Sequence, residues 1–204
     1  MSEADHGEET ADPESEDPDL PSWDDQYLRS VADRLKFNYD LERDRTVRGE
    51  SFEMYGRLAI ESQKQFLHQS INWANYETAE HLFVRRVDGV SRADLEHLVE
   101  LGHDLADEWI DADEEHQGTE FTFVLVVPRI PDGVRSFVDG FRDRTLLRYG
   151  YYGDYEINLA VVAPERETAV ASSEADTAVA FQLWRDPAEL TPSGLLGRLR
   201  SWLG

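Results

Sequence analysis

The stretch SRADLEHLVELGHDLADEWIDADEEHQGTEFTFVLVV, residues 91–127, decides the fold. Ser91 and Asp94 stand three residues apart, in the [ST]-x-x-[DE] arrangement that caps the start of a helix. Apolar side chains then recur at helical spacing: Leu95, Leu98, Val99, Leu101, Leu105, Ala106, Trp109 and Ile110. The run 121–127 is apolar on both faces, as in a central strand covered on two sides. A long helix that leads into a buried strand predicts a crossover within a sheet.

Upstream of this helix the apolar residues follow a period of two. Phe52, Met54, Gly56, Leu58 and Ile60 alternate with more polar positions, which predicts a half-buried strand over 52–61. Further strand candidates cover 39–47, 66–73 and 81–87. Ser22 and Asp25 repeat the capping pattern and predict a helix that ends near Phe37. This half of the chain predicts an antiparallel meander.

Downstream, the pattern predicts one more helix and two strands. Pro131 fits the first turn of a helix that continues with Val134, Phe137, Val138 and Phe141. Strands are predicted over 155–161 and 179–183, joined as a hairpin across 164–176. The fold class is therefore α+β (mixed α/β), in a single globular domain over 22–186. We expect one mixed sheet, with antiparallel N-terminal strands followed by β-α-β-α-β-β and helices packed on the sheet.

The charge balance is strongly acidic, with a formal net charge of −23. Among the 20 basic residues only Lys36 and Lys64 are lysines. Surplus carboxylates repel one another in dilute buffer and are screened at high salt, so we expect a halophilic protein in a salt-rich cytoplasm. The absence of cysteine excludes disulfides and thiolate nucleophiles. We expect neither a secretory signal nor a transmembrane segment, because the apolar run 121–127 is too short to span a bilayer.

The two ends of the chain differ from its centre. Residues 1–21 hold nine Asp or Glu and no Lys or Arg, which predicts a disordered acidic tail, either solubilising or an interaction arm. Residues 187–204 predict a linker and a short amphipathic helix that carries Arg198 and Arg200. Its apolar face consists of Leu195, Leu196, Leu199, Trp202 and Leu203. Two roles stay open: docking to a protein partner, with weak peripheral membrane contact, or folding back onto its own domain.

The run from Asp111 to His116 is the candidate metal site. Asp111, Asp113, Glu115 and His116 combine carboxylates with an imidazole, a set that could hold a divalent cation. The run does not fit a calcium loop, because His116 stands where the required glycine belongs. A solvated loop of a salt-adapted protein is the alternative interpretation. His81 alternates with apolar neighbours and is interpreted as a hydrogen-bonded core residue.

The aromatic segment 148–155 is the candidate ligand site. Arg148, Tyr149, Tyr151 and Tyr152 stand among two glycines and could line a pocket for a planar or anionic ligand. The alternative is a glycine turn whose tyrosines pack on the sheet. The glycines match no phosphate-binding pattern, and no cofactor is expected.

Two resemblances bear on function. The order of a helix, antiparallel strands, a crossover helix and a strand resembles that of the PD-(D/E)XK nucleases, but Glu61 and Lys64 are spaced to lie on opposite faces of a strand. The whole chain resembles uncharacterised proteins of halophilic archaea, through its arginine bias, the tail 14–18 and the closing segment 194–202. The stretch 52–162 resembles a domain of unknown function, through Glu115, His116 and Thr119 and through the segment 150–154. This resemblance implies no activity.

The sequence leaves the function unknown, with three hypotheses of different classes. The first is a non-catalytic binding or interaction protein. The alternatives are a metal-dependent hydrolase or nuclease-like enzyme and a small-ligand-sensing domain. No nucleic-acid partner is expected, because the net charge opposes binding to a polyphosphate.

Overall fold

The computed structural model of the protein describes residues 21–63 and 75–185. Three α-helices are described: α1 (Gln26–Leu35), α2 (Arg92–Trp109) and α3 (Asp132–Asp139). The strands are β1 (Asp40–Val47), β2 (Glu50–Gln63), β3 (Asn75–Arg86), β4 (His116–Val126), β5 (Asp143–Leu146), β6 (Asp154–Ala163) and β7 (Thr168–Ala171). Short 3₁₀ turns follow: η1 (Leu147–Gly150), η2 (Pro164–Arg166) and η3 (Asp176–Phe181).

The seven strands form one mixed sheet in the order β1-β2-β3-β4-β6-β5, with β7 also paired to β6. Strands β1, β2 and β3 form the antiparallel meander, and β3, β4 and β6 run parallel. Strands β5 and β7 are both antiparallel to β6, one beside residues 154–157 and the other beside 160–163. The predicted fold class, a mixed sheet with an antiparallel N-terminal part, is confirmed.

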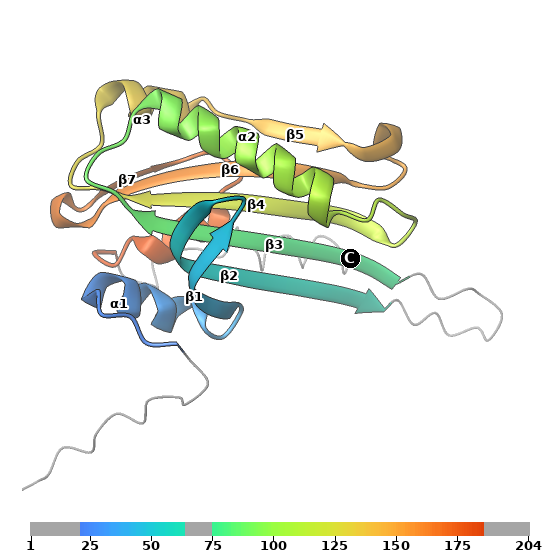
Figure 1. The fold of residues 1–204 in the computed structure, drawn as a ribbon, viewed down its shortest axis with the longest axis horizontal. Coiled ribbons are helices and arrows are strands. Elements are labelled where there is room, and N and C mark those ends of the chain that lie inside the picture. Colours follow the sequence, from blue (N-terminus) through green and yellow to red (C-terminus); the bar gives the residue numbers. More distant parts are fainter. Residues whose placement is uncertain (1–20, 64–74, 186–204) are drawn as a thin grey trace, which may run out of the picture.

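Helices cover both faces of the sheet, and each face has its own hydrophobic core. Helix α2 lies along one face (Figure 1), where its leucines pack with α3 and with alternate residues of the strands, such as Phe83 and Phe123. Helix α1 and η3 pack on the opposite face. They contact the strand residues that alternate with those of the first core, such as Val84 and Val124. Alternation along the strands therefore supplies both cores, which explains the continuous apolar run in β4.

The start of α2 follows the sequence prediction. The Ser91 side chain accepts a hydrogen bond from the Asp94 N–H, and the Asp94 carboxylate accepts one from the Ser91 N–H. These two bonds make a complete capping box. Nearer its end, α2 approaches the sheet closely at Gly102, where an added Cβ would lie 3.0 Å from Ile157. The helix thus reaches the sheet through a residue without a side chain.

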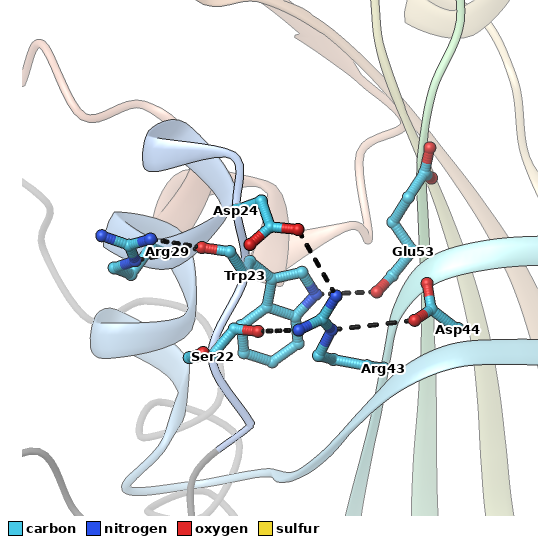
Figure 2. A network of polar contacts seen from close by, with 7 residues as sticks. All are labelled: Ser22, Trp23, Asp24, Arg29, Arg43, Asp44 and Glu53. Carbon is cyan, nitrogen blue, oxygen red and sulfur yellow. Dashed lines mark hydrogen bonds and ion pairs between the residues drawn. The ribbon is translucent and has the colours of Figure 1, made fainter.

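The start of α1 differs from the prediction. Its N-cap is Asp25, whose Oδ1 accepts hydrogen bonds from the N–H groups of Tyr27 and Leu28, whereas Ser22 was expected to cap the helix. The residues before it are used for tertiary contacts (Figure 2). Trp23 is buried and its indole donates to the Glu53 carbonyl at 2.7 Å, while Arg43 donates to the Ser22 carbonyl. These contacts hold the lead-in segment against β1 and β2 and leave the cap to Asp25.

The C-terminal strands also differ from the prediction. The strand expected over 179–183 is instead the turn η3, which ends at Phe181. Phe181 is fully buried and its carbonyl accepts a hydrogen bond from the Tyr27 hydroxyl, so this segment packs on α1. The partner of β6 is β7, inside the predicted hairpin loop, and it occupies the edge beside residues 160–163. Strand β5 was not predicted.

Three sequence predictions lie outside the described residues. They are the strand over 66–73, the amphipathic segment 187–204 and nearly all of the acidic tail. In the part of the chain that the structure describes, no helix combines the length and the apolar character needed to cross a membrane.

Candidate functional site

A cleft of about 580 Å³ lies on the α2 face, between the end of α2 and the beginnings of β3 and β4. Its lining includes small residues of these two strands, Ala79, Gly118 and Thr119. Trp109 and Ile110, at the end of α2, contribute apolar surface. The volume falls in the range typical of sites for small organic ligands.

A buried tyrosine–histidine pair lies at one side of the cleft. The Tyr55 hydroxyl lies 2.7 Å from Nδ1 of His81, and both side chains are buried. Burial raises the pKa of Tyr55 to about 12, so the phenol keeps its proton at neutral pH. Burial, with the nearby Arg57 and Arg45, lowers the pKa of His81 to about 4, so its ring is neutral. The prediction that His81 is a hydrogen-bonded core residue is confirmed.

The proton positions on His81 follow from this pair. If the protonated Tyr55 hydroxyl donates to Nδ1, the one proton of the neutral ring sits on Nε2. No hydrogen bond from Nε2 to another described residue is formed, and His81 lines the cleft. The ring packs on Phe121, with centroids 5.2 Å apart, and on Trp109 at 5.0 Å. In this tautomer the imidazole presents its Nε2–H as a donor to a ligand.

Two arginines supply positive charge beside His81. Arg57 pairs with His81 in the register of β2 and β3 and is exposed. It makes no hydrogen bond or ion pair with any described residue. Arg45 is bound to Glu42 at 2.7 Å and its guanidinium lies over the Tyr55 ring, 5.0 Å from the centroid. Among the described residues, Arg57 is thus the cleft arginine that lacks an acidic partner.

The predicted metal run also lines the cleft. Asp111, Asp113, Glu115 and His116 all line it, together with His81. The Asp113 carboxylate accepts hydrogen bonds from the N–H groups of Glu115 and His116, which fixes the loop. Within residues 21–63 and 75–185, no group of three or more His, Asp or Glu is arranged to hold a metal ion. The carboxylates therefore give this part of the cleft negative charge, and the metal site stays an untested prediction.

His116 links this loop to its neighbours on both sides. Its Nδ1 lies 2.7 Å from the carbonyl oxygen of Tyr152, and its Nε2 lies 2.9 Å from the Thr119 hydroxyl. A carbonyl only accepts, so Nδ1 carries the proton, and the Nε2 lone pair accepts the hydroxyl proton of Thr119. Thr119 is buried in the wall of the cleft.

The predicted ligand segment 148–155 lies beside this cleft and does not line it. Tyr149 and Tyr151 are 96% and 86% exposed, and Arg148 is also exposed. Tyr152 is half-buried and contributes only its carbonyl, the acceptor for His116. The structure therefore brings the metal run and this segment together through one hydrogen bond, with the tyrosine rings on the surface.

A second cavity, of about 460 Å³, lies between α2 and α3. Both of its arginines already have acidic partners, Arg92 with Glu96 at 2.8 Å and Arg142 with Glu174 at 3.8 Å. Arg92 also lies over the Phe137 ring. The first cleft, with an open cation and an open imidazole donor, is the better candidate site.

Sequence reasoning found part of this cleft and missed the rest. Arg45, Tyr55, Arg57 and Trp109 were not nominated, because they belong to β1, β2 and α2, which only the tertiary fold brings together. One signal was available in the sequence. Tyr55 and Arg57 stand two residues apart in a strand and therefore share a face. An arginine lies there next to an aromatic residue, on the face that is turned toward a helix.

Together these features define an α+β domain with one mixed sheet and an open cleft lined by both basic and acidic side chains. The chain belongs to the DUF8052 family, a domain of unknown function, whose family model matches residues 24–183. The expected membership of a domain family of unknown function is confirmed, over a longer stretch than the sequence resemblance covered. No curated protein and no solved structure shows significant similarity to the chain.

Proposed function

We propose that this protein is a binding protein whose cleft takes a small zwitterion with an apolar body, such as a free α-amino acid. The observation that carries the proposal is that groups of opposite charge line one cleft. Arg57 and His81 come from β2 and β3, whereas Asp111 and Glu115 come from the loop before β4. A carboxylate fits the first pair, since guanidinium and imidazole N–H groups donate to it, and an ammonium fits the second.

The apolar part of the ligand would lie against Trp109. Its indole lies in a wall of the cleft, and the small residues Ala79 and Gly118 leave room opposite it. An aromatic surface next to a few fixed polar groups is typical of small-molecule sites, in which apolar contact supplies affinity and polar groups supply orientation. This proposal develops the sequence hypothesis of a small-ligand-sensing domain and moves its site from the tyrosine segment to the cleft.

A charge series of ligands tests the proposal. We expect L-leucine to raise the melting temperature and to change tryptophan fluorescence, while N-acetyl-L-leucine, without the ammonium, and L-leucinamide, without the carboxylate, bind on the order of tenfold more weakly. Equal binding of all three ligands, or of none, would contradict it. The measurements need matched ionic strength, because salt screens the charges.

Arg57→Gln supplies the matched variant. Arg57 is exposed and has no described partner, so its loss should leave stability nearly unchanged and weaken L-leucine binding on the order of tenfold. Arg129→Gln is the control, since Arg129 is also exposed but lies outside the cleft. If both variants bind like the unchanged protein, the assignment of the carboxylate to Arg57 fails.

We also propose that the protein is adapted to high salt and located in the cytoplasm. We further propose that its C-terminal segment has an interaction role. The acid excess and the rarity of lysine support the first. The basic amphipathic pattern of 187–204, in a chain with a net charge of −23, supports the last.

A further inference from the structure

We propose that the same cleft also hydrolyses an ester or amide bond within a zwitterion, with Thr119 as nucleophile and His116 as its base. This inference rests on the proposed function, because the same charged groups hold the substrate. The substrate class is a dipeptide or its ester analogue, whose ammonium and carboxylate flank the bond that is cut.

The nucleophile and base already form the required hydrogen bond. The Thr119 hydroxyl lies 2.9 Å from Nε2 of His116, and the Tyr152 carbonyl, 2.7 Å from Nδ1, fixes the tautomer with its lone pair toward the hydroxyl. A nucleophile bonded to a base that a third group orients is the general arrangement of covalent acyl transfer. The Tyr152 carbonyl holds the place that a carboxylate or amide takes in other relays.

His81 supplies a donor for the charge that develops on the carbonyl oxygen. Thr119 pairs with Ala79 in the parallel register of β3 and β4, so His81 stands one strand across and two residues on, about 8 Å from Thr119 at the backbone. A carbonyl group between the two side chains could meet the hydroxyl at its carbon and the His81 N–H at its oxygen. Because the pKa of His81 is lowered to about 4, the ring stays a neutral N–H donor at neutral pH.

The proposed reaction balances with water as the second reactant. The Thr119 oxygen bonds to the carbonyl carbon while its proton moves to Nε2 of His116, and the negative charge collects on the carbonyl oxygen. The bond from carbon to the leaving oxygen or nitrogen then breaks, and the leaving group takes the proton from His116. A water molecule, deprotonated by His116, releases the acid and restores the Thr119 hydroxyl.

The charged groups of the cleft place the two ends of such a substrate. Asp111 and Glu115 lie on the loop directly before β4 and would hold the ammonium, while Arg57 on β2 would hold the carboxylate. Thr119 on β4 then lies between them, next to the scissile bond. Removal of either charge from the substrate should therefore reduce turnover as well as binding.

The test compares the unchanged protein with Thr119→Val and Thr119→Ser. The probes are L-leucyl-L-leucine and its ester analogue L-leucyl-L-leucic acid. Cleavage of either probe is measured as the rate at which leucine is released. We expect the ester to be cleaved at least tenfold above the buffer rate, Thr119→Val to fall to that rate and Thr119→Ser to retain cleavage. Intact-mass analysis of a stopped reaction should show a leucyl adduct on the unchanged protein and none on Thr119→Val.

Two outcomes overturn the inference: no cleavage above buffer by the unchanged protein, or cleavage by Thr119→Val at the rate of the unchanged protein. Binding of L-leucine, followed by tryptophan fluorescence in the same samples, separates the two proposals. Binding without cleavage leaves the binding function standing and refutes the hydrolase, while absence of both refutes the two together. Melting temperatures of the three proteins show whether a loss of cleavage reflects unfolding.

Discussion

The Tyr55 hydroxyl and Nδ1 of His81 lie 2.7 Å apart on neighbouring strands, with both side chains buried beneath the end of α2. Neither residue identifies the other in the sequence, where they stand 26 positions apart. The pair fixes the protonation of His81 and so the hydrogen-bond donor that the cleft presents. Four predictions follow from this pair and from other features of the fold.

Protonation of His81 should destabilise the protein between pH 6.5 and 4. The pKa of His81 falls from 6.5 to about 4 on folding, because of burial first and then Arg57 and Arg45. Within this window the unfolded chain binds more protons, so the free energy of unfolding decreases as the pH falls. The total effect approaches about 3 kcal/mol, at about 1.4 kcal/mol for each unit of pKa. Urea unfolding at several pH values measures it.

His81→Gln is the control for this pH effect. Glutamine can still bond to Tyr55 but does not titrate, so the loss between pH 6.5 and about 4.5 should disappear. The carboxyls with lowered pKa values, Asp25, Glu50 and Asp94, lose their stabilising contribution only as the pH falls below their ordinary values of 3.8 to 4.5. An unchanged pH slope in His81→Gln would show that other groups cause the effect.

Gly153→Ala should destabilise the protein strongly. Gly153 has φ of +71°, and an added Cβ would lie 2.0 Å from the carbonyl oxygen of Gln117. Backbone must therefore move where the segment 147–153 meets the start of β4, next to the bond between His116 and Tyr152. We expect a loss of more than about 2 kcal/mol, or a melting temperature lower by at least about 4 °C.

Gly150→Ala is the matched control for the change at Gly153. Gly150 also has a positive φ, +87°, but no atom lies within 4 Å of its added Cβ. This variant carries only the conformational cost of a left-handed alanine, about 1 to 2 kcal/mol. Equal melting temperatures for the two variants would mean that the backbone near Gln117 moves to admit the added Cβ without loss of stability.

Thr177→Val should cost about 1 to 3 kcal/mol, because it removes a hydroxyl that is hydrogen-bonded to two buried polar side chains. The Thr177 hydroxyl lies 2.5 Å from a carboxylate oxygen of Glu80 and 2.9 Å from the Tyr39 hydroxyl, on the face opposite the cleft. All three side chains are buried. Thr177→Ser keeps the hydroxyl and should recover most of the loss in thermal unfolding. Equal losses in the two variants would show that the loss of the hydroxyl is not the cause of the effect.

Potassium chloride should stabilise the protein. With a net charge of −23, repulsion between carboxylates opposes the compact state in dilute buffer, and salt near 1 M reduces the Debye length to about 3 Å. We expect the melting temperature to rise steadily from low salt to 1 M. Sucrose, which stabilises compact states without screening charge, is the reference. A melting temperature that sucrose raises and salt leaves constant would refute salt adaptation.

Features that depend on neighbours along the chain could be predicted from the amino-acid sequence. The capping box needs only Ser91 and Asp94, three residues apart, and the buried strand β4 needs only its own apolar run. The period-two and helical patterns fixed the mixed fold class for the same reason, since each element must bury the face that its own side chains make apolar. The run from Asp111 to His116 was visible as a candidate because its members are contiguous.

Which residues far apart in the sequence share a site could be seen only in the tertiary structure. Asp25, and not Ser22, caps α1, because contacts of Trp23 and Arg43 hold the residues before the helix against the sheet. The segment ending at Phe181 became a turn on α1 because β7 already occupied that edge of β6. Likewise, the register of β2 with β3 set Arg57 beside His81. Hydrogen bonding between strands and burial of apolar surface act across any separation in the chain, so no local pattern records their outcome.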